Sequence, residues 1–275
     1  GEYLQRVSLG GLLAVLVPIP ILPWMLKDIW NVQRSLPPDE PLPPLQRPAY
    51  CVLALTVLAM MILLFLLGEN LPIPVVPPSV AIIGASLALL VVYGLKVESV
   101  DRVLNDVDWK TLLFLTCMFL MVEAFTRTGI LHGLSRNMKD WFGTDLLAVA
   151  GVMLLGVSMT SSVLANIPVV AAMLLLAKGY LVAAEMVPEL ALGAAFTDWP
   201  APTLTIFIAM MFAGTLGGNA TLIGASANVV GAGICAAHGR PLSFATFARY
   251  GVPLTVCQLI ASGLYVLLLS RVLAP

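Results

Sequence analysis

The chain has 275 residues, 60% of them hydrophobic and 11% charged, with a formal net charge of −1. Soluble domains carry about 25% charged residues, so this composition and a mean hydropathy of +0.98 exclude that class and indicate a polytopic membrane protein. The net charge predicts no nucleic-acid partner. Long apolar runs, without the alternating strands of a closed barrel, predict an all-α fold in which each crossing needs about 20 residues.

The first part of the chain predicts three crossings and a linker. Residues 8–26 are long enough to cross, and three prolines would bend them. Residues 27–48 contain "SLPPDEPLPPLQRP", which is typical of an extended, solvated linker. We place this linker in the cytoplasm from the distribution of lysine and arginine. Residues 50–67 and 73–95 follow as the second and third crossings.

Residues 96–109 read "KVESVDRVLNDVDW" and mix charges with apolar residues at helical spacing. The apolar set is Val97, Val100, Val103, Leu104 and Val107. This pattern predicts an interfacial amphipathic helix that lies along the membrane surface. A solvated loop is the alternative.

The next crossing, residues 110–127, contains an acidic residue, Glu123. An acid within a membrane helix is a candidate for a functional site, here for proton or ion coupling. The alternative is structural, because Arg127 lies four residues further on, in the favourable order for an ion pair along a helix.

The apolar stretch 146–184 is nearly twice as long as one crossing and carries polar residues in its middle, "TSSVLANIP". Its first leg, residues 146–159, would span roughly 21 Å, which is less than the hydrocarbon core of about 30 Å. We therefore predict a re-entrant hairpin, with Pro168 in the opening turn of the second leg. The tip would hold Thr160, Ser161, Ser162 and Asn166.

Residues 203–238 also contain polar residues within an apolar run, "LGGNATLIGASANVVGAG". The flanks 203–216 and 227–237 are each about half a membrane thick, which predicts one crossing made of two half-helices around an unwound middle. We expect its glycines to supply unusual dihedrals and its Asn and Thr side chains to replace the hydration of a polar solute. Close helix packing through small residues is the alternative.

Residues 250–273 form the last predicted crossing. The sequence offers little for catalysis or metal binding, because its four cysteines lack ligand spacing and its two histidines, His132 and His238, stand apart. We expect no enzyme activity, no metal site and no cofactor beyond Na⁺ or H⁺ as a coupling ion.

Three longer stretches carry a family resemblance: "VDWKTLLFLTCMFLMVEAF", "SSVLANIPVVAAML" and "GGNATLIGASANVVGAGICAAHGRPLSFATFARYGVP". They resemble the C-terminal half of the ion transporter superfamily, in the branch of the melanosomal P protein, arsenite permease-like proteins and NhaD-type antiporters. The resemblance runs from about residue 50 to residue 273. It implies two inverted repeats, each with a re-entrant hairpin and a broken helix, so residues 1–26 would be the last helix of a missing first repeat.

The resemblance also implies that the chain contains a scaffold part and a transport part. Residues 49–95 would be scaffold, and residues 110–275 would be a transport part that moves as an elevator. Carried over by position, the ion and substrate site would be lined by Ser161, Ser162, Asn166, Asn219, Thr221, Gly224, Ser226 and Asn228.

One position departs from the family pattern. P-protein-like members have Asp directly before the hairpin Asn, where this chain has Ala165. The lost carboxylate counts against proton or sodium coupling at this hairpin. Glu123, in "VEAF" where the branch reads "MEAL", is the acid best placed to substitute.

We therefore expect a secondary active transporter of a small inorganic ion or oxyanion; arsenite or silicic acid efflux and sodium/proton coupling both stay open. The alternatives are a non-transporting membrane subunit or anchor that retains half of the fold, and an anion channel. The expected partners are the lipid bilayer, a missing N-terminal half or second chain, and a second copy in a homodimer. The expected location is a plasma, inner or organelle membrane, crossed several times.

Overall fold

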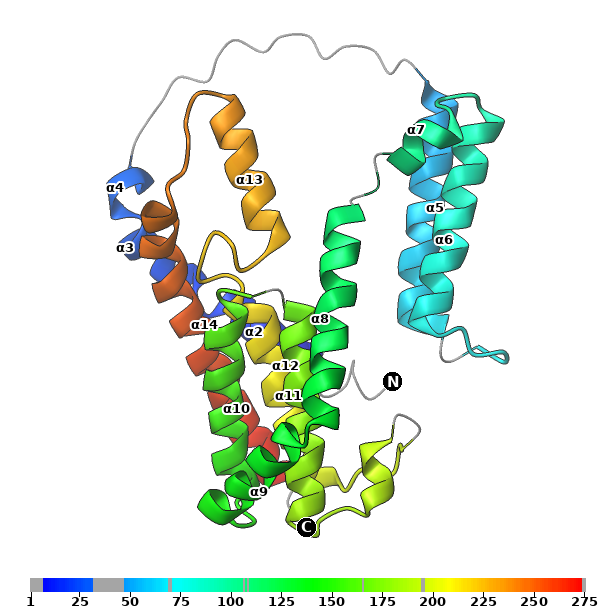
Figure 1. Ribbon diagram of the computed structural model, residues 1–275. Coiled ribbons are helices and arrows are strands. Elements are labelled where there is room, and N and C mark those ends of the chain that lie inside the picture. Colours follow the sequence, from blue (N-terminus) through cyan, green and yellow to red (C-terminus); the bar gives the residue numbers. More distant parts are fainter. Residues whose placement is uncertain are drawn as a thin grey trace. The chain divides into compact units, whose positions relative to one another are not determined.

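The fold is helical throughout the part of the chain that the structure describes. This computed structural model describes residues 7–31, 47–68, 71–105, 107, 109–164, 166–193 and 196–273. These residues form helices and no strand (Figure 1), which confirms the predicted all-α polytopic class. Among them, five helical segments are long and apolar enough to cross a membrane, and three shorter apolar helices accompany these.

The chain divides into two compact units, and each is described by itself. The first unit contains residues 33–112, and the second contains residues 2–32 and 113–275. The boundary falls within α8 (Trp109–Arg127), close to the predicted start of a crossing at residue 110. The assignment of one part as scaffold and the other as moving part stays a prediction.

The first unit is built on an antiparallel pair of helices, α5 (Pro48–Leu67) and α6 (Pro77–Gly94). Both helices begin at a proline, whose missing N–H costs little in a first turn. Gly84 lets the two helices approach closely, because a Cβ there would collide with the Met61 side chain. The predicted crossings at 50–67 and 73–95 correspond to these helices.

The predicted interfacial helix at 96–109 is shorter in the structure, where α7 covers only Val100–Asn105. Two local features set its start. Lys96 has a φ of 50°, in the left-handed region that ends a helix, and Ser99 Oγ accepts from the backbone N–H of Arg102 at 3.3 Å. Its position at a membrane surface stays a prediction.

The second unit is arranged around α12 (Leu204–Gly217). This helix packs against α10 (Leu146–Ser161), α11 (Asn166–Ala183) and α14 (Phe244–Leu273). It is apolar on all sides, as expected of a helix surrounded by others. The largest fully buried side chains of the unit are Tyr180, Leu181, Ile206 and Met210.

The predicted hairpin is present as α10 and α11, joined by a short turn (Figure 1). Asp145 caps α10 by accepting from the N–H groups of Leu147 and Ala148, both at 3.0 Å. With 16 residues, α10 spans only about 24 Å. That is two residues more than predicted and still less than the hydrocarbon core, so re-entry of this hairpin stays a prediction.

Two helices and a break stand where the broken helix is predicted, and their forming one membrane crossing stays a prediction. The first helix is α12, and the second is α13 (Ser226–Ala237). The break between them, residues 218–225, lies within one residue of the predicted boundaries. Pairing the hairpin tip with this break is what positions the candidate site.

The N-terminal segment is interrupted, as its prolines predict. It consists of α2 (Ser8–Leu16), a single 3₁₀ turn (Ile19–Ile21) and α3 (Leu22–Met25). In α2, a Cβ at Gly10 would lie 2.5 Å from ring atoms of both Phe212 and Tyr265, so α2 packs directly on α12 and α14.

The segment 27–48 was predicted to be an extended linker, but its first residues are helical. It opens with a helical turn, α4 (Lys27–Trp30), while residues 32–46 lie outside the described residues. Ala165, the position that departs from the family pattern, also lies outside them.

Two features were not predicted from the sequence. One is α9 (Ile130–Phe142), which is flanked by Gly129 and Gly143 in the left-handed region. It packs on α11, where Ser135 Oγ donates to the carbonyl of Leu176 at 3.3 Å. The other is the early start of α14 at Phe244 rather than residue 250, which follows from Ser243 accepting the N–H of Thr246 at 3.1 Å.

Candidate functional site

The hairpin tip and the break of the second unit meet at the end of α10. Ser161, the last residue of α10, is fully buried, and its hydroxyl lies 2.8 Å from the carbonyl oxygen of Gly214. It also lies 2.6 Å from the amide oxygen of Asn166, the first residue of α11. Ser161 therefore joins both legs of the hairpin to α12 at a single point.

Glycines of the break allow this close approach. A Cβ at Gly217 would lie 2.6 Å from the carbonyl oxygen of Ser158, and one at Gly224 would lie 2.9 Å from that of Ser162. A Cβ at Gly218 would lie 3.2 Å from the amide group of Asn166. None of the three has a positive φ, so the expectation that they supply unusual dihedrals is wrong. They are required because two backbones touch, which larger residues would prevent.

Polar side chains of the break complete the junction. Thr221 Oγ1 donates a hydrogen bond to the carbonyl of Ser162, which ties the break to the hairpin tip. Asn228, in the first turn of α13, donates from its amide nitrogen to the carbonyls of Gly218 at 3.0 Å and Thr221 at 2.9 Å. The unwound segment is thus held by the Asn228 amide together with single-turn backbone hydrogen bonds, such as that from the N–H of Asn219 to the carbonyl of Leu216 at 3.0 Å.

The last helix contributes a residue that sequence reasoning missed. Gln258 of α14 is buried, and its amide oxygen accepts from the amide nitrogen of Asn219 at 3.1 Å. Two turns away, a Cβ at Gly251 would lie 2.6 Å from the carbonyl oxygen of Asn219. An amide within an otherwise apolar run was the signal that could have indicated this contact, because buried polar groups need partners.

Thr255 lies on the same face of α14, between Gly251 and Gln258. Its hydroxyl is buried, and within the described residues it has no hydrogen-bond partner. A buried hydroxyl without a partner is costly. Thr255 thus places an unpaired hydroxyl on the face of α14 that meets the break.

Two of the predicted site residues are placed differently from the others. Ser226 begins α13 with an exposed side chain and takes part in no hydrogen bond seen within the described chain. Glu123 lies on α8, where its carboxylate accepts from Arg127 Nε at 2.8 Å. Of the two alternatives for Glu123, the structure shows the ion pair. The remaining predicted residues, Ser161, Ser162, Asn166, Asn219, Thr221, Gly224 and Asn228, are brought together.

The electrostatics of this junction come from helix ends and not from charged side chains. The segments 158–168 and 214–228 contain no Asp, Glu, Lys, Arg or His. Two helix N-termini, those of α11 and α13, begin at the junction, and each carries about half a positive charge. Two C-termini, those of α10 and α12, end there, and their last carbonyls carry the opposite partial charge. Such an arrangement can bind an anion at the first pair and a cation at the second.

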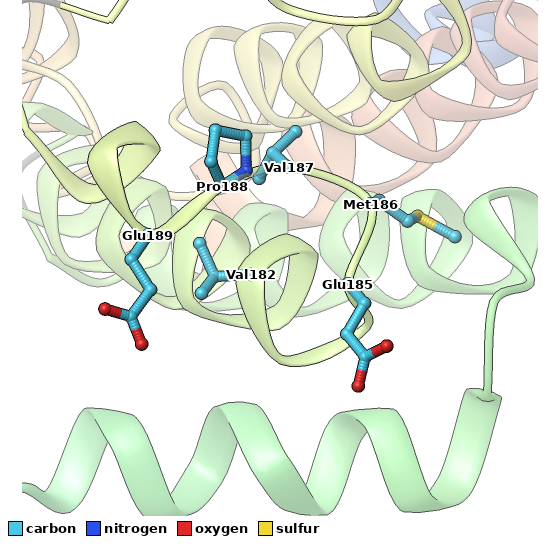
Figure 2. Close-up of a pocket in the computed structure, with 6 residues that line it drawn as sticks. All are labelled: Val182, Glu185, Met186, Val187, Pro188 and Glu189. Atoms are coloured by element: carbon cyan, nitrogen blue, oxygen red, sulfur yellow. The ribbon is translucent and has the colours of Figure 1, made fainter.

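Apart from the junction, a hollow in the surface lies at the C-terminal end of α11. Its volume is about 460 Å³, and its lining includes Val182, Glu185 and Glu189. Figure 2 shows the two carboxylates pointing to the same side of the loop. An adjoining hollow of about 420 Å³ adds His132, Arg136 and Lys139 of α9. Both signs of charge are mixed here, and within the described residues no group of three or more His, Cys, Asp or Glu could hold a metal ion.

Comparisons with known proteins agree with the family resemblance. The citrate transporter family profile matches residues 5–197. An uncharacterized transporter of Synechocystis sp. is 39% identical over 266 residues, which cover 96% of this chain and 59% of that protein. The human P protein is 34% identical over 219 residues, which cover 78% of this chain and 24% of that protein. This chain thus spans about three fifths of the Synechocystis protein and less of the human one. No solved structure gives a significant match.

Proposed function

Because this chain belongs to the citrate transporter family, we propose that the complete protein is a secondary active transporter that moves a small oxyanion or oxyacid by alternating access. The observation that carries this proposal is the junction of the hairpin tip with the helix break. It joins two helix N-termini to uncharged amide and hydroxyl groups, and no acidic side chain is there to repel an anion.

The substrate class follows from these donors. Two N-termini and the amide donors of Asn166 and Asn219 that stay free within the described chain suit oxygen atoms of an oxyanion, a carboxylate or a neutral oxyacid such as arsenite. A bare cation would have to rely on the carbonyls at the ends of α10 and α12, which suits a coupling Na⁺ better than the main cargo. The ion pair of Glu123 with Arg127 gives no support to Glu123 as the proton-coupling residue.

The division of the chain into two compact units supports an elevator-type mechanism. The hairpin, the broken helix and the last helix all belong to the second unit, so the whole junction can travel as one body. The first unit, with α5 and α6, would then serve as the scaffold.

The proposal is tested by transport into proteoliposomes that contain the complete protein. Citrate, arsenite and silicic acid are offered in turn, with and without Na⁺ and pH gradients. Asn166→Ala should lower the initial rate at least about tenfold, because a hydrogen bond to a charged solute is worth about 1.5–3 kcal/mol. Asn228→Ala should lower the rate as well, because it removes the two hydrogen bonds that hold the break. Asn137→Ala, on the exposed face of α9, is the matched control and should transport as wild type.

Two outcomes would overturn this reasoning. Undiminished transport by both variants would show that the junction does not bind the solute. A folded wild-type protein that transports none of the offered solutes would favour the alternative of a non-transporting membrane subunit.

A further inference from the structure

An apolar groove on the second unit ends at a single lysine. The groove has a volume of about 340 Å³, at the lower end of the range for small-molecule sites. Apart from Lys178, it is lined only by apolar and aromatic side chains, namely Val170, Leu174, Trp199, Phe207, Met210 and Met211. Its charged end is remote from the junction, since Lys178 follows Asn166 by 12 residues, or about 18 Å along α11.

Lys178 has partners but no counter-charge within the described residues. Its ammonium group donates to the carbonyl of Gly193 at 2.9 Å and lies 5.5 Å from the centre of the Trp199 ring. Among the residues described, no carboxylate lies within 4.0 Å of it. A lysine in a membrane helix is costly and normally pairs with an anion or reaches the interface. A carbonyl and a ring face hold the charge in place without neutralising it.

The lysine lies near one end of its helix. Lys178 precedes the last residue of α11, Ala183, by five residues, or about 8 Å, and an extended lysine side chain covers most of that distance towards the headgroup region. Beside it, the Trp199 ring meets the rings of Phe196 and Phe207 edge to face, and its centroid lies 4.9 Å from each of theirs. Tryptophan and lysine together are typical of the membrane–water interface.

The groove runs from this charged end along α11 towards Val170. Val170, Leu174 and Lys178 follow one another at intervals of four residues, so they line one face of α11 over about 12 Å. The opposite wall is the antiparallel α12, through Phe207 and Met211. The result is a narrow apolar groove with a positive charge at the end where Lys178 lies.

We propose that this groove binds an anionic phospholipid, with one acyl chain along α11 and α12 and the phosphate paired with Lys178. The apolar lining suits hydrocarbon and offers a water-soluble anion nothing beyond the lysine. The missing negative charge at the Lys178 end is what a phosphodiester supplies. The bilayer presents such lipids at the depth where Lys178 lies. The site is independent of the transported solute.

Native mass spectrometry of the complete protein tests this proposal. Phosphatidylglycerol and phosphatidylcholine with identical acyl chains are titrated separately. Wild type should bind phosphatidylglycerol about fivefold more tightly, equivalent to about 1 kcal/mol for one lysine near an anionic headgroup. Lys178→Ala should abolish this preference, and Lys178→Arg should retain it. Lys139→Ala removes a lysine that already faces Glu185 at 3.9 Å and should leave the preference unchanged.

A second variant tests the groove itself. Val170→Trp fills the groove and should weaken binding of both lipids, while Lys178 stays in place. Equal affinity of wild type for the two lipids would overturn the proposal without any variant being needed. A preference that survives Lys178→Ala, or a photoactivatable acyl chain that labels only peptides outside α11 and α12, would overturn it as well.

Discussion

Replacing Gly224 with alanine tests whether contact between two backbones holds the candidate site together. The added Cβ would lie 2.6 Å from the carbonyl oxygen of Gly218, 2.9 Å from its Cα and 2.9 Å from the carbonyl oxygen of Ser162. All three neighbours are backbone atoms, so no flexible side chain can move aside. Overpacking of this kind costs about 1–3 kcal/mol. Gly224→Ala should therefore destabilise the second unit by that amount and separate the break from the hairpin tip.

The matched control is Gly231→Ala, on α13. A Cβ there meets nothing within 4 Å, so the change should stabilise the helix by about 0.5–1 kcal/mol through helix propensity alone. Unfolding of the complete protein in one detergent, followed by circular dichroism, compares the two variants with wild type. The two changes in stability should have opposite signs. If Gly224→Ala is as stable as wild type, close approach of the break to Ser162 is not a requirement of the fold.

Two further predictions concern residues around the site. Gln258→Leu should destabilise the protein by about 1–3 kcal/mol, because it leaves the Asn219 amide without its buried acceptor; thermal unfolding measures this, and a second change, Asn219→Leu, should recover part of the loss. Glu123→Gln should leave the dependence of uptake on Na⁺ and pH gradients unchanged, because Glu123 is engaged with Arg127. Loss of that gradient dependence, with solute exchange intact, would restore Glu123 as the coupling residue.

The sequence allowed the interrupted helices to be predicted because length and composition conflict there. An apolar leg too short to cross, followed by Ser161 and Asn166, has few physical solutions in a bilayer. The same conflict located the break of 218–225 to within one residue. These predictions rest on the chain's own geometry, and the contacts of Thr221 and Asn228 then join the two features.

Other features could not be predicted in this way. The helix α9 mixes apolar residues with charges, and Met138 becomes recognisable as a core residue only when α11 lies against it. Gln258 is a partner of Asn219 across 39 residues, a pairing that no local pattern contains. The glycines of the break were predicted for their dihedral angles and instead allow close approach, because close approach depends on the partner segment, which the local sequence does not show.

The two halves of the broken helix differ in how firmly they are built in. Ten of the 14 residues of α12 are buried, whereas none of the 12 residues of α13 is buried in the described structure. Displacing α12 would disrupt a filled core, while displacing α13 breaks mainly the two amide hydrogen bonds of Asn228. The break thus separates a largely buried helix, α12, from an exposed helix, α13, which few contacts hold in place. Within the described chain, α13 can therefore change its position at little cost in packing.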